Sequence, residues 1–460
     1  MNIHLVGVCG TGMGSFAGLL QRVGHVVRGS DAAAFPPMSI KLAAWGIEVR
    51  SPYRAENLDP VPELVVIGNA IRRTNPEAQA VVQRGLRHTS FPAALSDMFL
   101  RQRHPVVVAG THGKTTTTSM IAHLLVEAGL DPSFLVGGIP TNFGEGFRLG
   151  GGPHFVVEGD EYDSAFFDKR PKFLHYRPQT LILTSLEYDH ADIYPDLSSI
   201  VAQFRNLIAL VPPDGLILAA ADSTNLPLEA ARAPVVFYGR SHARHASLGQ
   251  ACAMATEVTH ESIHTRFTLD GQRFEMRLAG GFNVDNAVAA IHVARSLGVP
   301  LSTSARSLAS FEGVLRRQTI RAEVRGIRLI DDFAHHPTAV RATLEGLRPQ
   351  VRGRLLAVFE PRTATSARRI FQEAFAGAFD GADEVIIAPV GRPELADHER
   401  LDVQRLAQDI RARGTPAHAL SSVHEIVTHL AAEARSGDAL VFMSNGDFGG
   451  IHDLMEAALR

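Results

Sequence analysis

Short apolar runs alternate with longer amphipathic stretches from the beginning of the chain. Residues 3–7 and 26–29 have the apolar character of buried strands, and the stretch between them predicts a helix over about 12–23. A strand over residues 65–68 and a helix over 77–83 continue the pattern. This alternation of strands and helices is typical of a parallel α/β sheet.

The same alternation starts again twice further along the chain. After Pro105, strands are predicted at 106–109, 155–157 and 180–183, with helices over 114–128 and after Asn283. In the last part, strands are predicted at 327–330, 355–359, 384–388 and 439–443. The sequence therefore predicts three α/β domains, which we place at residues 1–103, 104–321 and 322–460.

The composition is that of an ordinary soluble globular protein. Of 460 residues, 45% are hydrophobic, and the net charge of −3 supplies no electrostatic reason to expect nucleic-acid or anionic-membrane binding. Cys9 and Cys252 are too few for a disulfide framework and lack the spacing of a metal site. No apolar run approaches the roughly 20 residues of a membrane span, and the first residues lack a signal-peptide pattern. We therefore expect a cytoplasmic protein, and the sequence does not specify its oligomeric state.

A glycine- and threonine-rich loop with one lysine carries the strongest chemical signal. It follows a predicted strand and precedes a predicted helix, and its residues are Gly110, Thr111, His112, Gly113, Lys114, Thr115 and Thr116. Glycines let backbone N–H groups close around phosphate oxygens, Lys114 reaches the β- and γ-phosphates, and Thr115 or Thr116 supplies a ligand for Mg²⁺. Because only four of the 45 basic residues are lysines, a lysine here favours phosphate binding over an ordinary turn.

A second glycine-rich loop, over residues 7–14, also joins a strand to a helix. No register of this loop gives G-x-G-x-x-G, so a dinucleotide-dependent oxidoreductase is a weak interpretation. The glycine-lined helix start can still hold a diphosphate, and Asp31 ends the next strand about where a ribose-binding acid lies. A purely structural turn remains the alternative.

Several acids, histidines and asparagines follow the phosphate loop at strand ends or helix starts. Residues 158–163 and 187–190 are rich in carboxylates, which suit Mg²⁺, and the second group ends in His190. Asn283 and Asn286 share one helix face and would either contact adenine or cap the helix. Residues 331–337 place two aspartates and two histidines after a strand, where a carboxylate can hold a ribose.

These motifs together resemble the Mur ligase family, whose members couple ATP hydrolysis to amide-bond formation on UDP-muramoyl substrates. The similarity spans essentially the whole chain and rests on motifs in the family's order: GTHGKTT, EGDE, EYDH, GFNVDN and DDFAHHP. It implies a Rossmann-like N-terminal domain that binds the UDP-sugar and a central P-loop ATPase-type domain that binds ATP. A C-terminal Rossmann-like domain would contact the peptide and the nucleotide.

The resemblance also implies a role for particular residues. Those implied in catalysis are Lys114, Glu158, His190, His335 and His336. Those implied in ATP binding are the loop residues Gly110 to Thr116 together with Asn283, Asn286, Arg317 and Asp332. Those implied at the UDP-sugar are Gly10, Thr11, Gly12, Met13, Ser30 and Asp31. Thr115, Glu158 and His190 would serve Mg²⁺, and Arg362 would receive a carboxylate of the peptide.

Further stretches resemble one subgroup of the family, which joins UDP-N-acetylmuramate to L-alanyl-γ-D-glutamyl-meso-diaminopimelate in cell-wall recycling. They include GSDAAAFPPMS, EYDSAFFDKRPKFLHYRPQTLIL, FEPRTATS and VFMSNGDFGGIH. The implied reaction passes through an acyl phosphate of the muramoyl carboxylate. Within the family, the alternative is the biosynthetic subgroup that uses free L-alanine. A nucleotide sensor that binds ATP without catalysis is the alternative from another class.

Overall fold

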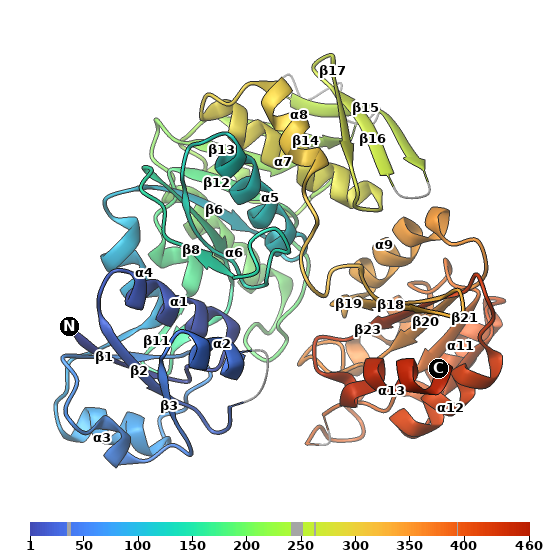
Figure 1. Cartoon of the computed structure of the whole chain (residues 1–460), viewed down its shortest axis with the longest axis horizontal. Helices are drawn as coiled ribbons and strands as arrows, with labels where there is room; N and C mark the ends of the chain where they lie inside the picture. The colour runs from blue at the N-terminus through green and yellow to red at the C-terminus, as the bar shows by residue number, and fades with distance from the viewer. Residues whose placement is uncertain (35–37, 241–251, 262–263, 393) are drawn as a thin grey trace. The chain divides into compact units, whose positions relative to one another are not determined.

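The computed structural model describes residues 1–34, 38–240, 252–261, 264–392 and 394–460 (Figure 1). Residues 35–37, inside one of the stretches that resemble the recycling subgroup, lie outside the described residues. The contacts divide the chain into two compact units. Unit 1 comprises Met1–Glu187, Leu197–Met254 and Asn286–Leu308, and unit 2 comprises Tyr188–Asp196, Ala255–Asp285 and Ala309–Arg460.

The N-terminal part of unit 1 is a parallel five-stranded sheet with the strand order β3-β2-β1-β4-β5. Its strands are β1 (Asn2–Val6), β2 (Val26–Ser30), β3 (Glu48–Arg50), β4 (Leu64–Ile67) and β5 (His88–Ser90), and its helices are α1 (Thr11–Arg22), α2 (Met38–Ala44), α3 (Pro76–Gln83) and α4 (Phe91–Leu95). Because β1 lies between β2 and β4, the loop after β1 is at the point where the strand order reverses. Ligands of open α/β sheets bind at such points.

The central part of unit 1 repeats this arrangement around β6. Its strands pair in the order β14-β13-β12-β6-β9-β7-β8, parallel except for β7 and β8. They are β6 (His104–Ala109), β7 (Ser133–Leu135), β8 (Phe147–Arg148), β9 (His154–Gly159), β12 (Thr180–Leu183), β13 (Leu216–Ala220) and β14 (Val235–Arg240). The helices are α5 (Lys114–Glu127), α6 (Leu197–Ala209), α7 (Gly281–Ser296) and α8 (Leu301–Ala309), of which α7 belongs to unit 1 only from Asn286 on and α8 only as far as Leu308. Since β6 lies between β9 and β12, the glycine-rich loop after β6 is again at a reversal of strand order.

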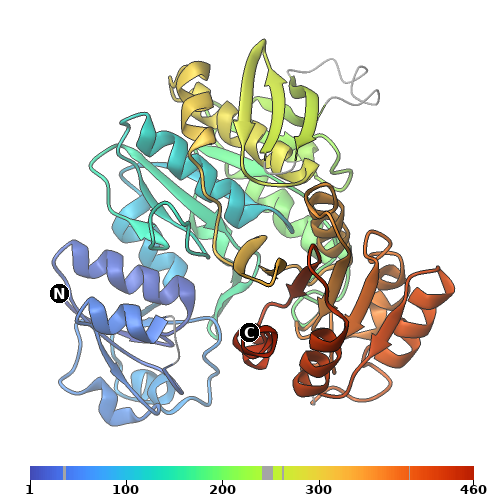
Figure 2. The ribbon, with the colours of Figure 1, turned by 45° about the vertical axis from the view of Figure 1, so that its right-hand side comes forward.

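Unit 2 contains a six-stranded sheet with the order β18-β19-β23-β20-β21-β22, in which only β18 and β19 are antiparallel. Its elements are β18 (Thr319–Val324), β19 (Ile327–Asp332), β20 (Leu355–Phe359), β21 (Glu384–Ile387), β22 (Ala417–Ala419), β23 (Ala439–Met443), α9 (Pro337–Leu347), α10 (Gln372–Ala376), α11 (Val403–Ala412), α12 (Val423–Glu433) and α13 (Ile451–Leu459). Helices α9 and α11 cover one face of this sheet, and α12 and α13 cover the other (Figures 1 and 2).

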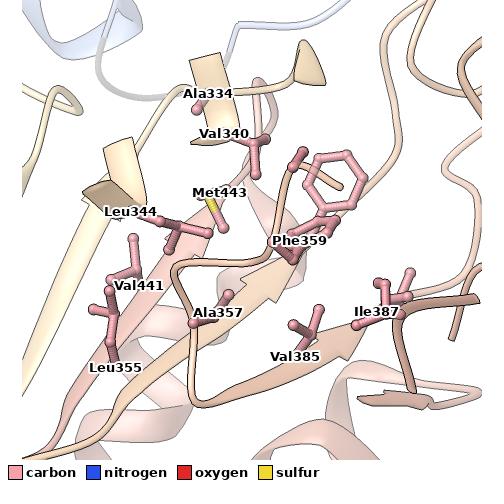
Figure 3. Packing of buried hydrophobic residues seen from close by; sticks show 14 of the residues in the cluster. Ala334, Val340, Leu344, Leu355, Ala357, Phe359, Val385, Ile387, Val441 and Met443 are labelled. Carbon is pink, nitrogen blue, oxygen red and sulfur yellow. The ribbon is translucent and has the colours of Figure 1, made fainter. Parts of the chain in front are cut away.

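The core of this sheet shows how strand periodicity makes two hydrophobic layers. Along β20, Leu355, Ala357 and Phe359 face α9, whereas Leu356 and Val358 face α12 and α13. Figure 3 shows the first layer, where the strand side chains meet residues of α9. Successive side chains of a strand point to opposite faces, so a strand buried on both sides reads as a continuous apolar run.

Most of the predicted elements are present in the structure. The strand predicted at 180–183 is β12, the helix predicted at 114–128 is α5, and the four strands predicted after residue 322 are β19, β20, β21 and β23. The sequence did not predict the antiparallel strands β15 (Cys252–Glu261), β16 (His264–Leu269) and β17 (Gln272–Met276). These strands are exposed on one side and therefore lack a continuous apolar run. Within the described residues, no helix is both long and apolar enough to cross a membrane.

Replacing Phe359 tests the importance of the α9 layer. Its ring is fully buried and packs against Phe375 at 4.9 Å between centroids, so Phe359→Ala should destabilise the protein by about 3–5 kcal/mol. Leu454→Ala is the control, because Leu454 is exposed and its loss should cost no more than about 0.5 kcal/mol. Urea unfolding followed by circular dichroism would measure both. Equal midpoints for the two variants would contradict the assigned core.

Candidate functional site

The loop after β6 is held by the segment that follows β12. The Thr111 N–H donates to the Ser185 carbonyl at 3.0 Å, and the His112 N–H donates to Ser185 Oγ at 2.9 Å. Gly110 has a φ of +140°, and a Cβ at this position would lie 2.2 Å from Thr184 Oγ1. Only glycine therefore lets the loop approach β12 so closely.

Lys114 is the first residue of α5, and its side chain turns back into this loop. Its Nζ donates to both carboxylate oxygens of Glu161, at 2.8 and 3.0 Å, and to the Gly110 carbonyl at 2.6 Å. Burial would lower the pKa of Lys114, but the nearby carboxylates of Glu161 and Asp160 raise this pKa above its ordinary value. Lys114 is therefore a fixed cation at neutral pH in a loop suited to phosphate.

Thr115 and Glu158 place hard oxygen atoms next to this cation. Thr115 Oγ1 donates to Glu158 Oε1 at 2.9 Å, and the Gly137 N–H donates to Glu158 Oε2 at 2.8 Å. Glu158 lies beside Val108 in the pairing of β9 with β6, so its carboxylate is at the end of the sheet where the loop begins. A hydroxyl and a carboxylate oxygen in contact are a suitable pair of ligands for Mg²⁺.

Helix α7 places Asn286 against the same loop. Asn286 Oδ1 accepts a hydrogen bond from Thr117 Oγ1 at 3.0 Å, and both side chains are buried. A Cβ on Gly113 would lie only 2.7 Å from Asn286 Oδ1. The alternative that Asn283 and Asn286 cap the helix is wrong, because α7 begins at Gly281 and Asn283 Nδ2 donates back to a carbonyl, that of Ala279, at 2.7 Å.

The loop after β1 forms a second glycine-lined helix start. Helix α1 follows Gly10, and a glycine has no side chain that could cap the first N–H groups of the helix. Asp31 lies next to this loop, where its carboxylate accepts from the Cys9 N–H at 2.8 Å and from the Tyr53 hydroxyl at 3.1 Å. Burial, followed by the Asp31 charge, raises the pKa of the Cys9 thiol to about 11, so this thiol remains protonated at neutral pH. Thr11, Gly12 and Met13 are the first residues of α1.

Ser30 supports this loop from inside the domain. Its carbonyl accepts from the N–H groups of Gly7 and Val8 at 2.9 and 3.1 Å, and its hydroxyl donates to the buried carboxylate of Glu77 at 2.5 Å. His4 Nε2 contacts the same carboxylate at 3.0 Å. The Ser30 side chain is fully buried and bonded to Glu77, and the role of Ser30 at the UDP-sugar site stays a prediction.

In unit 2, Asp332 ends β19 and lies in a buried cage of donors. It accepts from the N–H groups of Gln318 and Ala334, both at 2.8 Å, and from Thr343 Oγ1 at 3.2 Å. Burial raises the pKa of Asp332, while the charge of Arg317 and these hydrogen bonds partly oppose the increase. Asp332 is therefore held in one orientation at the carboxyl end of the sheet.

The two histidines after β19 have different environments. His336 is the N-cap of α9 and accepts from the Thr338 N–H at 3.3 Å. His335 Nδ1 lies 2.9 Å from the Phe333 carbonyl, and its Nε2 lies 3.8 Å from Asp189. Burial would raise the pKa of Asp189, but its interactions with His335 and the neighbouring His190 hold this pKa well below its ordinary value. His190 follows with a left-handed φ of +57°.

Arg362 follows β20 at the same edge of the sheet as Asp332. The register pairs Met443 of β23 with both Asp332 and Phe359, which places the ends of these strands at one level. The Arg362 stem passes close to Gly446, where a Cβ would lie 2.7 Å from Arg362 Cδ. Its guanidinium is half exposed and lies 3.5 Å from Glu360.

Comparison with known proteins decides the family. The chain matches the Mur ligase family catalytic domain over residues 2–103, the Mur ligase middle domain over 108–294, and the Mur ligase glutamate ligase domain over 316–446. The chain belongs to the Mur ligase family. The three α/β domains and the family predicted from the sequence are confirmed. Mur ligases use ATP to form amide bonds, so the chain is a ligase of this type.

Individual Mur ligases are similar over nearly the whole length. Relatives from Escherichia coli and Haemophilus influenzae are 41% and 38% identical over 98% of this chain and 97% of their own, and both are named UDP-N-acetylmuramate–L-alanyl-γ-D-glutamyl-meso-2,6-diaminoheptandioate ligase. A Rhizobium etli relative named UDP-N-acetylmuramate–L-alanine ligase is 33% identical over 96% of this chain and 94% of its own. The crystal structure of a murein peptide ligase from Psychrobacter arcticus matches with a TM-score of 0.73 and 36% identity, covering 100% of this chain and 98% of that one.

Each compact unit brings together part of the predicted Mur ligase site. Unit 1 groups the phosphate loop with Glu158 and Asn286, whereas Asn283, His190 and the residues after β18 belong to unit 2. The sequence did not indicate that Glu161 pairs with Lys114, although Glu161 belongs to the carboxylate-rich residues 158–163. Tyr53 was also missed, and nothing near it in the sequence marks it.

Gly113→Ala tests whether the close contact between Gly113 and Asn286 of α7 is needed for the phosphate loop to bind ATP. An alanine would be strained by about 1–2 kcal/mol at the φ of +79° and would also collide with Asn286. We expect ATP binding, measured by isothermal titration calorimetry, to weaken at least about tenfold, which corresponds to 1.4 kcal/mol.

Gly129→Ala is the matched control, because Gly129 has a similar φ of +76° and no atom within 4 Å of an added Cβ. Gly129→Ala should lose about as much stability as Gly113→Ala loses from backbone strain, and should keep its affinity for ATP. If both variants bind ATP equally well, the contact between Gly113 and Asn286 has no role in the loop.

Proposed function

We propose that this chain joins the carboxylate of UDP-N-acetylmuramate to the amine of L-alanyl-γ-D-glutamyl-meso-diaminopimelate, with hydrolysis of ATP. The observation that carries the proposal is the identity of 41% and 38%, over 98% of the chain, to the two relatives with this name. The R. etli relative named for free L-alanine is 33% identical over a similar length. The reaction returns a released wall peptide to a nucleotide-linked precursor, which is a step of peptidoglycan recycling.

The phosphate loop of unit 1 is the proposed site of the ATP triphosphate. Gly110 to Thr116 would surround the phosphates with backbone N–H groups at the start of α5, where the helix dipole favours negative charge. Lys114 would add a fixed positive charge. Asn286 is proposed to contact adenine from α7. In unit 2, Asn283, Arg317 and Asp332 are the proposed contacts to the base, the phosphates and the ribose.

Mg²⁺ is proposed as the accompanying ion. Thr115 Oγ1 and Glu158 Oε1 fit it, because both are hard oxygen donors and lie 2.9 Å apart. A bound Mg²⁺ would neutralise charge on the phosphate oxygens. His190 is assigned as a further ligand from the family resemblance alone.

The UDP-sugar is proposed to bind at the loop after β1. The N–H groups at the start of α1, in Gly10, Thr11, Gly12 and Met13, would hold the diphosphate. Asp31 would contact the ribose or the base, and Tyr53 would orient the Asp31 carboxylate through the hydrogen bond at 3.1 Å. Ser30 would act through the Glu77 network that shapes this loop.

The proposed chemistry has two steps. First, a muramoyl carboxylate oxygen attacks the γ-phosphorus, the bond to ADP breaks, and an acyl phosphate forms. Lys114 would stabilise the negative charge that develops on the phosphate oxygens, and its raised pKa keeps it protonated for this role. Second, the peptide amine attacks the carbonyl carbon and loses a proton as phosphate leaves.

Domain roles follow from these assignments. Residues 1–103 are proposed to bind the UDP-sugar, residues 104–321 to bind ATP, and residues 322–460 to contact the peptide and the nucleotide. In the last domain, His335 and His336 are proposed catalytic residues. Arg362 would receive a carboxylate of the peptide, since its guanidinium has only Glu360 as a nearby ionic partner among its described contacts and is half exposed.

Phosphate release tests the choice of substrate. We expect the enzyme to release phosphate from ATP with Mg²⁺, UDP-N-acetylmuramate and the tripeptide, and not when free L-alanine replaces the tripeptide. Mass spectrometry should detect the nucleotide-linked tripeptide. Turnover with L-alanine alone would assign the chain to the biosynthetic activity, and binding of ATP without turnover of either substrate would favour a nucleotide sensor.

Lys114→Ala tests the role of the loop cation and separates catalysis from stability. The substitution leaves the Glu161 carboxylate, which is 3% exposed, without its cation and should destabilise the protein by about 3–5 kcal/mol. Turnover should fall at least about a hundredfold. In the double variant Lys114→Ala/Glu161→Gln, stability measured by urea unfolding should largely recover while turnover stays low. Recovery of turnover together with stability would show that Lys114 is only structural.

A further inference from the structure

A second cluster of metal-binding residue types lies in unit 2, away from the proposed substrate sites. It consists of Glu384, the first residue of β21, His418 in the middle of β22, and His429 on α12. One ligand atom from each side chain lies within 4.8 Å of the others. Glu384 is three residues before the end of β21, so the cluster is roughly 10 Å along the strands from the edge that carries Asp332 and Arg362.

The secondary structure places all three side chains on one face of the sheet. His418 pairs with Ile386 in the register of β22 and β21, and Glu384 is two residues before Ile386, so the three share a face. Ile386 packs in the hydrophobic layer beneath α12 and α13. Since His429 is on α12, two adjacent strands and the helix that covers them fix the positions of the cluster.

The two separations from Glu384 Oε1 are close to those of ligands around a single metal ion. Glu384 Oε1 is 2.9 Å from His429 Nε2 and 3.8 Å from His418 Nε2. Ligands bound at 2.0–2.2 Å in a tetrahedral site lie roughly 3.3–3.6 Å from one another, so both separations from Glu384 Oε1 are within about half an ångström of this range. The two imidazole rings have centroids 5.0 Å apart.

A neighbouring ion pair orients the carboxylate. Arg354 Nη1 lies 3.8 Å from Glu384 Oε2, which is the oxygen that does not face the histidines. The Arg354 charge is balanced by Asp438, which accepts from its Nε at 3.2 Å and from its Nη2 at 2.8 Å. Partners of this kind around a metal ligand fix its orientation. The Arg354 charge therefore attracts Oε2, while Oε1 is the oxygen near the two imidazoles.

The exposure of the three side chains leaves a path for an ion. The Glu384 side chain is 11% exposed, that of His429 26%, and that of His418 46%. The carboxylate is largely buried and the two imidazoles are more exposed, so water can reach the imidazoles. A solvent molecule can then complete four-coordination.

We propose that Glu384, His418 and His429 bind a divalent transition-metal ion of the zinc or nickel type. Two imidazoles and one carboxylate favour such an ion over Mg²⁺, which requires oxygen ligands. The bound ion links the edge strand β22 to β21 and α12, and so stabilises unit 2. This site is independent of the proposed substrate specificity, because none of its residues belongs to the substrate-binding set.

Zinc binding by His418→Ala tests the proposal. Purified full-length protein, freed of metals by chelation, is dialysed against Zn²⁺ with excess Mg²⁺ and ATP, and bound zinc is counted by mass spectrometry. We expect the wild-type protein to bind one more zinc ion than the variant. Any zinc bound near the phosphate loop is common to both proteins and cancels. Zinc should also raise the melting temperature of the wild-type protein and not that of His418→Ala.

His424→Ala is the matched control, because His424 is an exposed histidine of α12 and is not one of the three ligands. It should bind zinc like the wild-type protein. His429→Ala is a second test variant and should lose the same ion. Because His418 is almost half exposed, its replacement should leave the circular dichroism spectrum unchanged. Equal zinc content in the wild-type protein and His418→Ala, or no zinc bound by either, would overturn the proposal.

Discussion

The parallel pairing of β6 with β9 and β12 is the constraint on which the proposed ATP site depends. Backbone hydrogen bonds fix Val108 opposite Glu158 and Ala109 opposite Leu183, so the ends of the three strands reach one edge of the sheet together. The phosphate loop, the Glu158 carboxylate and the segment after β12 are therefore neighbours without being close in sequence. Parallel strands all end at the same edge, which is why ligands of such sheets gather there.

The same constraint recurs in the five-stranded sheet of unit 1 and in the six-stranded sheet of unit 2. The loop after β1 lies where the strand order of the first sheet reverses, and in unit 2 the ends of β19, β20 and β23 are at one level. In each case the apolar strands build the core, while the polar residues that follow them lie at the edge. The register of the strands therefore determines both how the core packs and where the polar residues after the strands lie.

Three buried ionisable groups near these edges have polar partners. Lys114 has the carboxylate of Glu161, Asp332 has two N–H groups and a hydroxyl, and Glu77 has His4 and Ser30. An unpaired buried charge costs several kcal/mol, so the partners are as important as the groups that contact a ligand. The buried Ser30 hydroxyl, for example, contacts Glu77 and its carbonyl contacts the loop after β1.

The sequence by itself determined the alternation of strands and helices, the phosphate loop and the family, because these depend on residues that are near one another in the chain. Strand and helix periodicity and the glycines of a loop are local properties. Exposed strands such as β15 to β17 lack that signal and were not predicted. Only the tertiary structure decided which distant side chains meet: Thr117 with Asn286, 169 residues apart, Lys114 with Glu161, and Glu384 with His418 and His429. Such pairs follow from strand register and helix packing, which no local pattern encodes.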